Sequence, residues 1–357
     1  MKIAILLPNW VGDAVMATPT VRAVRRHYPQ AKLIGVMRPA VAHTLDGLPW
    51  LDERWCFDPR AQDRQLGSWH LLRRLRNERP DVVLLLPNSL RTGVLAWLSG
   101  ASRRVGYARY GRGPLLTEKR KFKKSGSRFL PSPTLDAYLE LAYLLGCPLE
   151  SPRTELRTLP ADEAATDRAW DELDLPPGRE VVVINTGAAY GPAKNWPVTH
   201  FAELAAWIAT RHQLSVLVIC GPQERAAALE IVARAGHPRV KSLAERPLSI
   251  GLSKACVRRS RLMISTDSGP RHFAAAFDVP VVTLYGPTHV AWGDTHYRHA
   301  VHLRREVPCG PCMKRICPLG HHRCMEELSV PHVAAAVERL LGQTAPTPRV
   351  PSAATVS

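Results

Sequence analysis

The sequence predicts an α/β protein with two domains, each built around an open parallel β-sheet. Short, continuous apolar runs alternate with helical apolar patterns, as expected when parallel strands are buried on both faces. The alternation pauses at the stretch 160–178 and then restarts, and a length of 357 residues suits two domains of ordinary size. We therefore expect one domain over residues 1–165, a second over 175–342, and a disordered tail over 343–357, which is rich in Pro, Ser, Thr and Ala.

The first half alternates between the two patterns from its first residues. Strands are expected at 2–8, 32–37, 54–57, 82–86 and 104–107, and helices at 14–27, 66–79, 92–98 and 135–145. Pro19 lies inside the first helical pattern and should start or kink a helical turn there. The segment 109–133 is basic, contains several glycines and is long for a connection, which indicates a functional loop.

The second half repeats the alternation. Strands are expected at 156–159, 181–185, 214–220, 262–265 and 281–285, and helices at 161–173, 197–212, 225–235, 248–258, 272–277 and 330–341. This repetition is the main reason for predicting a second parallel sheet.

The stretch 264–288 places two polar turns around one short helix, at 265–268 and 286–288. Residues of the types found at 265–268 often cap helices, and Pro270 suits a first helical turn. In a parallel sheet both turns lie at the carboxyl ends of strands, where ligands bind, and the N–H groups at a helix start attract anions such as a diphosphate. The pattern favours a ligand site over two ordinary connections.

Two other polar features also follow strands. The loop 186–195 (TGAAYGPAKN) combines a strand end, glycines, Lys194 and a helix start, which are the components of a diphosphate-binding loop; a merely solvated Lys194 is the alternative. Asp13 follows the first strand at a helix beginning, and the helix dipole there should favour its ionised form. On position alone, a plain capping role is the simpler interpretation of Asp13.

The net charge of +17, from 48 basic and 31 acidic side chains, implies attraction to anions such as nucleic acid, an anionic membrane or a phosphorylated substrate. The basic residues cluster at Arg103, Arg104, Arg109, Arg112 and 119–124. No strong nucleic-acid-binding motif accompanies them, and the GxGxxG and GxxxxGK[ST] motifs of dinucleotide-binding and P-loop proteins are absent from the sequence. The chain lacks a long apolar run and a secretion signal, so we expect a cytoplasmic protein.

Four of the eight cysteines gather in one segment, CGPCMKRICPLGHHRC, as Cys309, Cys312, Cys317 and Cys324. Closely spaced thiolates can bind zinc, but this spacing is not that of two paired CxxC motifs. Packed free thiols and redox chemistry remain the alternatives.

Four passages resemble the bacterial lipopolysaccharide heptosyltransferases of glycosyltransferase family 9: PNWVGDAVMATP, NTGAAYGPAKNWP, STDSGPRHFAAAFDVPVVTLYGPT and CGPCMKRICPLGHHRCM. They occur in the family's order over nearly the whole chain. The resemblance implies the GT-B architecture, in which two Rossmann-like domains face each other across a cleft. The C-terminal domain would hold the ADP-sugar and the N-terminal domain the lipid acceptor, and the last helix, 330–341, would pack back onto the first domain.

The resemblance also implies roles for individual residues. Asp13 would be the catalytic base, and Lys194 with Thr186, Gly187, Ser268 and Gly269 would stabilise the leaving diphosphate without a metal. Further expected donor-site residues are Asp267 and His272, near the sugar and phosphates, and Glu224, at the ribose. Expected acceptor-site residues in the basic loop are Arg120, Lys121, Lys123 and Lys124.

The expected reaction is inverting transfer of L-glycero-D-manno-heptose from ADP-heptose to the first heptose of the lipopolysaccharide inner core. The acceptor would be heptosyl-Kdo2-lipid A at the cytoplasmic face of the inner membrane, with no cofactor and no nucleic acid as partner. Within the family, the Cys-rich segment favours this acceptor over addition of the first heptose to Kdo, or of a later heptose. A Rossmann oxidoreductase and a nucleic-acid-binding protein drawn by the +17 charge are the alternatives from other classes.

Overall fold

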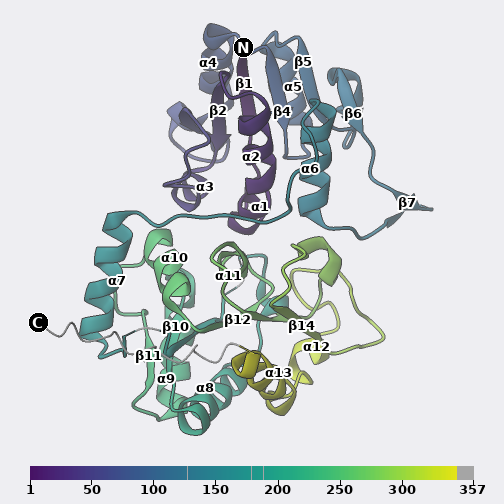
Figure 1. The fold of residues 1–357 in the computed structure, drawn as a ribbon. Helices are drawn as coiled ribbons and strands as arrows, with labels where there is room; N and C mark the ends of the chain where they lie inside the picture. Colours follow the sequence, from purple (N-terminus) through teal and green to yellow (C-terminus); the bar gives the residue numbers. More distant parts are fainter. Residues whose placement is uncertain (127, 178, 188, 344–357) are drawn as a thin grey trace, which may run out of the picture.

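The computed structural model describes residues 1–126, 128–177, 179–187 and 189–343, and it consists of two lobes, one above the other in Figure 1. Each lobe contains a six-stranded parallel sheet, with strand order β3-β2-β1-β4-β5-β6 in the first and β11-β10-β9-β12-β13-β14 in the second. Helices flank both sheets (Figure 1). The predicted pair of α/β units is therefore confirmed.

The first lobe follows the predicted alternation. Its strands are β1 (Lys2–Leu6), β2 (Lys32–Met37), β3 (Glu53–Cys56), β4 (Val82–Leu85), β5 (Arg103–Tyr107) and β6 (Glu118–Arg120), with the hairpin β7 (Lys124–Ser125) and β8 (Arg128–Phe129). Its helices are α1 (Val11–Met16), α2 (Thr18–His27), α3 (Pro39–Thr44), α4 (Ser68–Glu78), α5 (Leu90–Leu98) and α6 (Thr134–Leu144). Pro19 lies in the first turn of α2, so the predicted start of a helical turn is confirmed.

The second lobe repeats the arrangement. Its strands are β9 (Val181–Asn185), β10 (Ser215–Ile219), β11 (Val240–Ser242), β12 (Leu262–Thr266), β13 (Val281–Tyr285) and β14 (Ala300–Arg304). Its helices are α7 (Pro160–Glu172), α8 (Val198–His212), α9 (Arg225–Ala235), α10 (Ile250–Arg259), α11 (Arg271–Ala276), α12 (Arg323–Glu326) and α13 (Val330–Gln343). No helix in the described part of the chain is long and apolar enough to cross a membrane.

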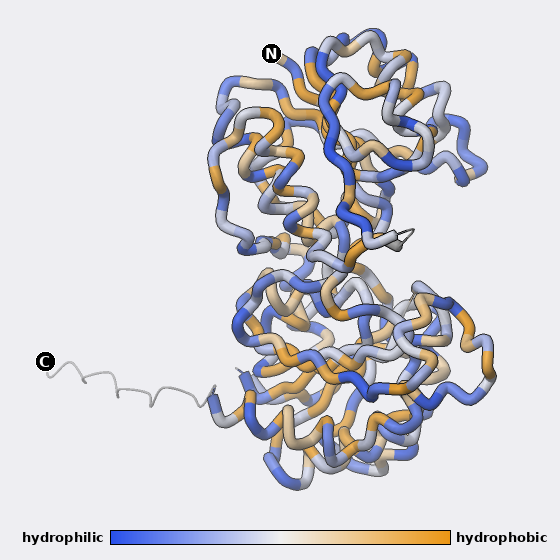
Figure 2. Tube along the Cα trace, turned by 90° about the vertical axis from the view of Figure 1, so that its right-hand side faces the viewer, coloured by the Kyte–Doolittle hydropathy of each residue, from blue (hydrophilic) through white to orange (hydrophobic). Residues whose placement is uncertain are grey.

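Apolar strands form the centre of each lobe. All residues of β9, β10, β12 and β13 are buried, and full burial of one large apolar side chain stabilises a fold by about 1.5–3 kcal/mol. Figure 2 shows the apolar segments gathered inside each lobe, with polar segments on the outside and a narrow waist between the lobes. The parallel register brings the carboxyl ends of neighbouring strands together at one edge.

Two sequence-based expectations are wrong. The segment 156–159 is not a strand; it belongs to the extended connection between the lobes, where Leu156 is buried without joining a sheet. Helix α13 does not pack on the first lobe. It packs against α8 and β13 through apolar side chains such as Val333 and Val337, because its apolar face completes the core of the second lobe (Figure 1).

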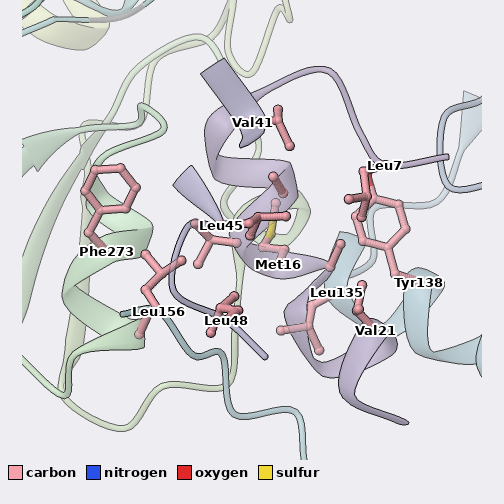
Figure 3. Close-up of a cluster of buried hydrophobic side chains, with 14 of the residues drawn as sticks. Leu7, Met16, Val21, Val41, Leu45, Leu48, Leu135, Tyr138, Leu156 and Phe273 are labelled. Atoms are coloured by element: carbon pink, nitrogen blue, oxygen red, sulfur yellow. The ribbon is translucent and has the colours of Figure 1, made fainter. Parts of the chain in front are cut away.

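The lobes meet through a shared apolar cluster and a buried lysine. Phe273 of α11 belongs to the same cluster as Met16, Leu45 and Leu156 (Figure 3). Lys254 of α10, which is fully buried, donates to the carbonyl oxygens of His43 and Thr44 at 3.2 and 3.3 Å, and to that of Arg157 at 2.9 Å.

We propose that the boundary between the domains lies at 165–175. Helix α7 runs through the start of this boundary region and packs against α10 of the second lobe. Of the predicted tail, residues 344–357 lie outside the described part of the chain.

Candidate active site

A cavity of about 650 Å³ lies between the two lobes. The first lobe contributes α1 and the residue before it, with Trp10, Gly12 and Asp13, and also Thr134 at the start of α6. The second lobe contributes the loops that follow β9, β10, β12 and β13, which are neighbours in its sheet. Of the expected donor-site residues, those lining the cavity are Gly187, Lys194, Glu224, Asp267, Ser268, Gly269 and His272.

A buried ion network occupies the second-lobe wall of the cavity. Lys194 Nζ lies 2.5 Å from Asp267 Oδ2 and also donates to the Asp267 carbonyl oxygen at 2.8 Å. Thr288 Oγ1 donates to Asp267 Oδ2 at 2.6 Å, while Arg271 Nε lies 3.3 Å from Oδ1. Burial alone would raise the pKa of Asp267, but the charges of Arg271 and Lys194 outweigh it and lower this pKa to about 2. Asp267 is therefore a fixed negative charge.

Asp13 faces this network from the first lobe. Burial, followed by the negative charge of Asp267, raises the pKa of Asp13 to about 6, although Lys194 and Arg271 act in the opposite direction. The expectation that the helix start favours the ionised form gives the wrong direction, because desolvation is the larger effect in α1. Trp10 occupies the N-cap position and α1 has no side-chain cap hydrogen bond, so Asp13 is not a capping residue.

The lobes also come close together at Gly12 of the first lobe and at Gly269 and His272 of the second. A Cβ atom added at Gly12 would lie 2.8 Å from His272 Cδ2 and 3.1 Å from Gly269 Cα. His272 is buried, and burial, followed by the charge of Arg271, lowers its pKa well below the ordinary value, so its imidazole is neutral. Its Nδ1 has no hydrogen-bond partner in the described part of the chain.

The turn after β12 does not form a side-chain helix cap as expected. Pro270 occupies the N-cap position of α11, and no side-chain cap hydrogen bond is present there. Ser268 Oγ instead accepts from Asn185 Nδ2 at 2.8 Å, and Thr266 Oγ1 donates to the Gly187 carbonyl oxygen at 3.1 Å. The turn is thereby joined to the end of β9. Asn185 was not predicted as a site residue. A polar residue at the end of the apolar run VVVIN could have indicated it.

Two glycines make room for Glu224 beside the cavity. A Cβ atom at Gly187 would lie 2.8 Å from Glu224 Cδ, and one at Gly221 would collide with Glu224 Oε2. The carboxylate thus lies between the loops after β9 and β10. Thr186, the residue before Gly187, is buried but does not line the cavity, and its hydroxyl lacks a hydrogen-bond partner among the described residues.

The Cys-rich segment contacts the loop that carries Lys194. Arg315 accepts at its carbonyl oxygen from Ala193 N at 3.0 Å, and the Met313 carbonyl oxygen accepts from the Tyr190 hydroxyl at 2.7 Å. All four cysteines of the segment are free thiols, and the described residues contain no group of three or more His, Cys, Asp or Glu side chains placed to hold a metal ion. The described residues of this segment therefore do not form a set of zinc ligands.

The expected acceptor-site residues lie elsewhere. Those residues, all exposed, are Arg120, Lys121, Lys123 and Lys124. They lie at the end of β6, in the connection that follows it, and in β7, which projects from the first lobe in Figure 1, and they do not line the cavity. Arg112 does not belong to this basic surface, because its guanidinium is fully buried and donates to the Tyr107 carbonyl oxygen at 2.8 Å and to Asn88 Oδ1 at 3.0 Å.

Comparison with known proteins identifies relatives along most of the chain. The sequence profile of glycosyltransferase family 9 (heptosyltransferase) matches residues 68–323. Lipopolysaccharide heptosyltransferase 2 of Escherichia coli K12 is 29% identical over 299 residues, which cover 81% of this chain and 83% of that protein. Lipopolysaccharide heptosyltransferase 1 of Pseudomonas aeruginosa is 32% identical over 165 residues, 44% of each. The solved structure of E. coli ADP-heptose LPS heptosyltransferase II matches with a TM-score of 0.76 at 24% identity, over 96% of this chain and 99% of that one, which confirms the GT-B fold.

Proposed function

Since the chain belongs to glycosyltransferase family 9 and is a glycosyltransferase, we propose that it transfers L-glycero-D-manno-heptose from ADP-heptose to the first heptose of the lipopolysaccharide inner core. One observation carries the proposal. The Asp13 carboxylate of the first lobe, with a pKa of about 6, faces a second-lobe wall across the cavity, and this wall holds a buried lysine and an ionised aspartate. A base and an anion-binding wall on opposite sides of a cavity suit displacement of a nucleoside diphosphate by a hydroxyl.

Asp13 acts as the general base in this proposal. The acceptor hydroxyl oxygen forms a bond to the anomeric carbon of the heptose while its proton passes to the Asp13 carboxylate and the bond to the ADP oxygen breaks. Attack opposite the leaving group inverts the anomeric centre in one step. A carboxyl group whose pKa is about 6 is mostly ionised at neutral pH, and a positioned base typically contributes about 10²–10⁴-fold to the rate.

The second lobe stabilises the leaving ADP. Lys194 and Thr186, with the backbone of Gly187, Ser268 and Gly269, meet the negative charge that grows on the diphosphate. Asp267 and His272 lie at the sugar and phosphates, and Glu224 at the ribose. The proposal requires no metal and no cofactor, because the lysine and the N–H donors supply the positive potential.

The acceptor lipid approaches from the first lobe. Arg120, Lys121, Lys123 and Lys124 are exposed side chains of a chain with net charge +17, and they bind phosphates of the inner core and of the membrane surface. The enzyme is accordingly cytoplasmic and peripheral to the inner membrane, and nucleic acid is not its partner.

A matrix of donors and acceptors tests the proposal. ADP-heptose, ADP-glucose and UDP-glucose are each offered with Kdo2-lipid A and with heptosyl-Kdo2-lipid A, and transfer is followed by mass spectrometry. We expect product only from ADP-heptose with the heptosylated acceptor. Product with Kdo2-lipid A instead would support the second candidate, transfer of the first heptose, which the likeness to the Pseudomonas heptosyltransferase 1 favours. Absence of transfer from ADP-heptose to either acceptor would refute both.

A further inference from the structure

Arg271, a buried cation to which the proposed mechanism gives no role, lies directly behind the cavity. Its side chain is 3% exposed and is not part of the cavity lining. Its Nε lies 3.3 Å from Asp267 Oδ1, its Nη2 donates to the Gly293 carbonyl oxygen at 2.5 Å, and its guanidinium lies 5.4 Å from the Tyr285 ring centre. Burying a guanidinium costs free energy unless the group is paired, so the contact with Asp267 is needed to offset the burial of Arg271.

The two oxygens of Asp267 are held by different partners. Oδ2 receives Lys194 Nζ at 2.5 Å and the Thr288 hydroxyl at 2.6 Å, whereas Oδ1 faces Arg271. A diphosphate in the cavity would compete with Asp267 for Lys194, because Lys194 lines the cavity and Arg271 does not. If Lys194 were the only cation paired with Asp267, that competition would leave the Asp267 carboxylate buried and uncompensated, which is strongly unfavourable.

We propose that Arg271 is a positioning residue that neutralises Asp267 from behind and thereby leaves Lys194 available to the diphosphate of the donor. The inference rests on the proposed function, since it requires a diphosphate ligand. It assigns no contact between Arg271 and the substrate. The guanidinium acts only through the carboxylate that it faces.

Arg271 also joins the donor wall to the first lobe. The Gly293 carbonyl oxygen that it binds belongs to the 3-10 turn Val290–Gly293, in which Trp292 lines the cavity. The Trp292 carbonyl oxygen accepts from Thr134 Oγ1 of α6 at 2.7 Å. One side chain therefore positions both the ionised aspartate and the turn that reaches the acceptor lobe. No room exists for a larger residue at the turn, because a Cβ atom at Gly293 would collide with Arg271 Nη2.

The test is ADP affinity, measured by calorimetry in full-length variants. Arg271→Met removes the charge while keeping much of the side-chain length, and we expect it to weaken ADP binding by about 10- to 100-fold, the range of a charged hydrogen bond. Arg271→Lys keeps the charge and should retain affinity within about tenfold of the wild-type protein.

A second substitution separates this role from a merely structural one. Asp267→Asn removes the carboxylate that would retain Lys194, so the double variant Arg271→Met/Asp267→Asn should recover ADP affinity relative to Arg271→Met. A packing defect would not be repaired in this way.

Wild-type affinity in Arg271→Met, or no recovery in the double variant, would overturn the inference while leaving the proposed function standing. If Arg271→Met does not fold, Arg271→Lys provides the test. ADP binding more than about 100-fold weaker in Arg271→Lys, despite a native circular dichroism spectrum, would contradict the role given to the charge. Wild-type protein that binds ADP but transfers no heptose would refute only the proposed function. Wild-type protein that does not bind ADP would refute both.

Discussion

The two lobes carry sheets of the same strand order, but they contribute to the cavity in different ways. The first lobe offers mainly the short helix α1, with the carboxylate of Asp13, and also Thr134 at the start of α6. The second offers four successive strand ends with a lysine, an aspartate, a glutamate and several N–H and hydroxyl groups. The shared sheet fixes where a site can form, at the carboxyl ends of the strands, and the loops decide what chemistry occurs there.

The pKa values of two aspartates, one from each lobe, illustrate this difference. Asp13 and Asp267 belong to the same cavity, yet burial raises the pKa of Asp13 to about 6 whereas Arg271 and Lys194 hold that of Asp267 near 2. Among the described residues, no cation forms a direct ion pair with Asp13, whereas Asp267 is paired with Lys194 and Arg271. One carboxylate is thus able to accept a proton near neutral pH, and the other remains an ion.

The largest expected effect comes from removing the proton acceptor of the first lobe. Asp13→Asn should lower kcat by about 10²–10⁴-fold and leave ADP affinity nearly unchanged, because the amide keeps the shape but accepts no proton. Single-turnover transfer and calorimetry measure the two quantities. Asp63→Asn, at an exposed position outside the cavity, is the matched control and should leave both unchanged. A near-normal kcat in Asp13→Asn would remove this residue as the base.

A substitution in the second lobe should, in contrast, change the affinity for ADP. Lys194→Ala should weaken ADP binding by about 10- to 100-fold and also slow transfer, because a charged donor to the diphosphate is lost. Lys241→Ala, in the edge strand β11 of the same lobe, makes the same charge change away from the cavity and should have no effect. Unchanged ADP affinity together with normal transfer in Lys194→Ala would show that the diphosphate lies elsewhere.

The close contact between Gly12 and His272 offers a third test. Gly12→Ala should lower kcat/KM by about tenfold, because its Cβ atom would lie 2.8 Å from His272 Cδ2 and would separate base from donor. Gly100→Ala controls for a generic glycine effect in the first lobe, since a Cβ atom there meets nothing within 4 Å, although its φ of 81° carries its own strain. An unaltered kcat/KM in Gly12→Ala would mean that the lobes separate further during the reaction.

The sequence was sufficient to predict the central strands because parallel strands buried on both faces are unbroken apolar runs. It predicted the edge strand β3 but was insufficient at the other three sheet edges. Strands β6 (EKR) and β11 (VKS) are short and polar, and β14 (AVHLR) is only partly buried, so none has the pattern of a central strand. Conversely, the segment 156–159, which was predicted to be a strand, belongs to the connection between the lobes, and Leu156 joins the apolar cluster without strand pairing.

The site was predictable to the extent that polar residues follow buried strands. Asp267 and Lys194 lie in polar segments located in this way, whereas Glu224 was expected only from the resemblance, and the structure brings all three to one cavity wall. The raised pKa of Asp13 was not predictable, because it depends on burial in the folded protein and on the charge of Asp267 in the other lobe. The burial of Arg112 was equally hidden, since a basic, glycine-containing segment resembles a solvated surface until its partners are known.

The pH dependence of kcat/KM directly tests the difference in pKa between Asp13 and Asp267. The base must be ionised, so kcat/KM should rise with pH through a midpoint of about 6, reach a plateau above it, and at pH 5 fall to about one tenth of the plateau. Asp267, with a pKa of about 2, stays ionised throughout this range and contributes no second step. Rates measured from pH 4.5 to 8.5 with a stable acceptor check the profile. A midpoint near 4 would mean that Asp13 titrates as an ordinary exposed carboxyl group.

The smallest expected effect concerns the acceptor side alone. The double variant Lys123→Glu/Lys124→Glu should raise the KM for lipid acceptor in anionic micelles by about threefold, because it reverses two charges on the exposed hairpin segment while the cavity stays intact. Arg239→Glu/Lys241→Glu makes the same charge change on the second lobe and should leave that KM unaltered. Both pairs should keep wild-type ADP affinity, and the difference between them should vanish at high salt, where charges are screened. An equal rise of KM in both pairs would show that net charge, rather than the first-lobe hairpin, draws the enzyme to its lipid.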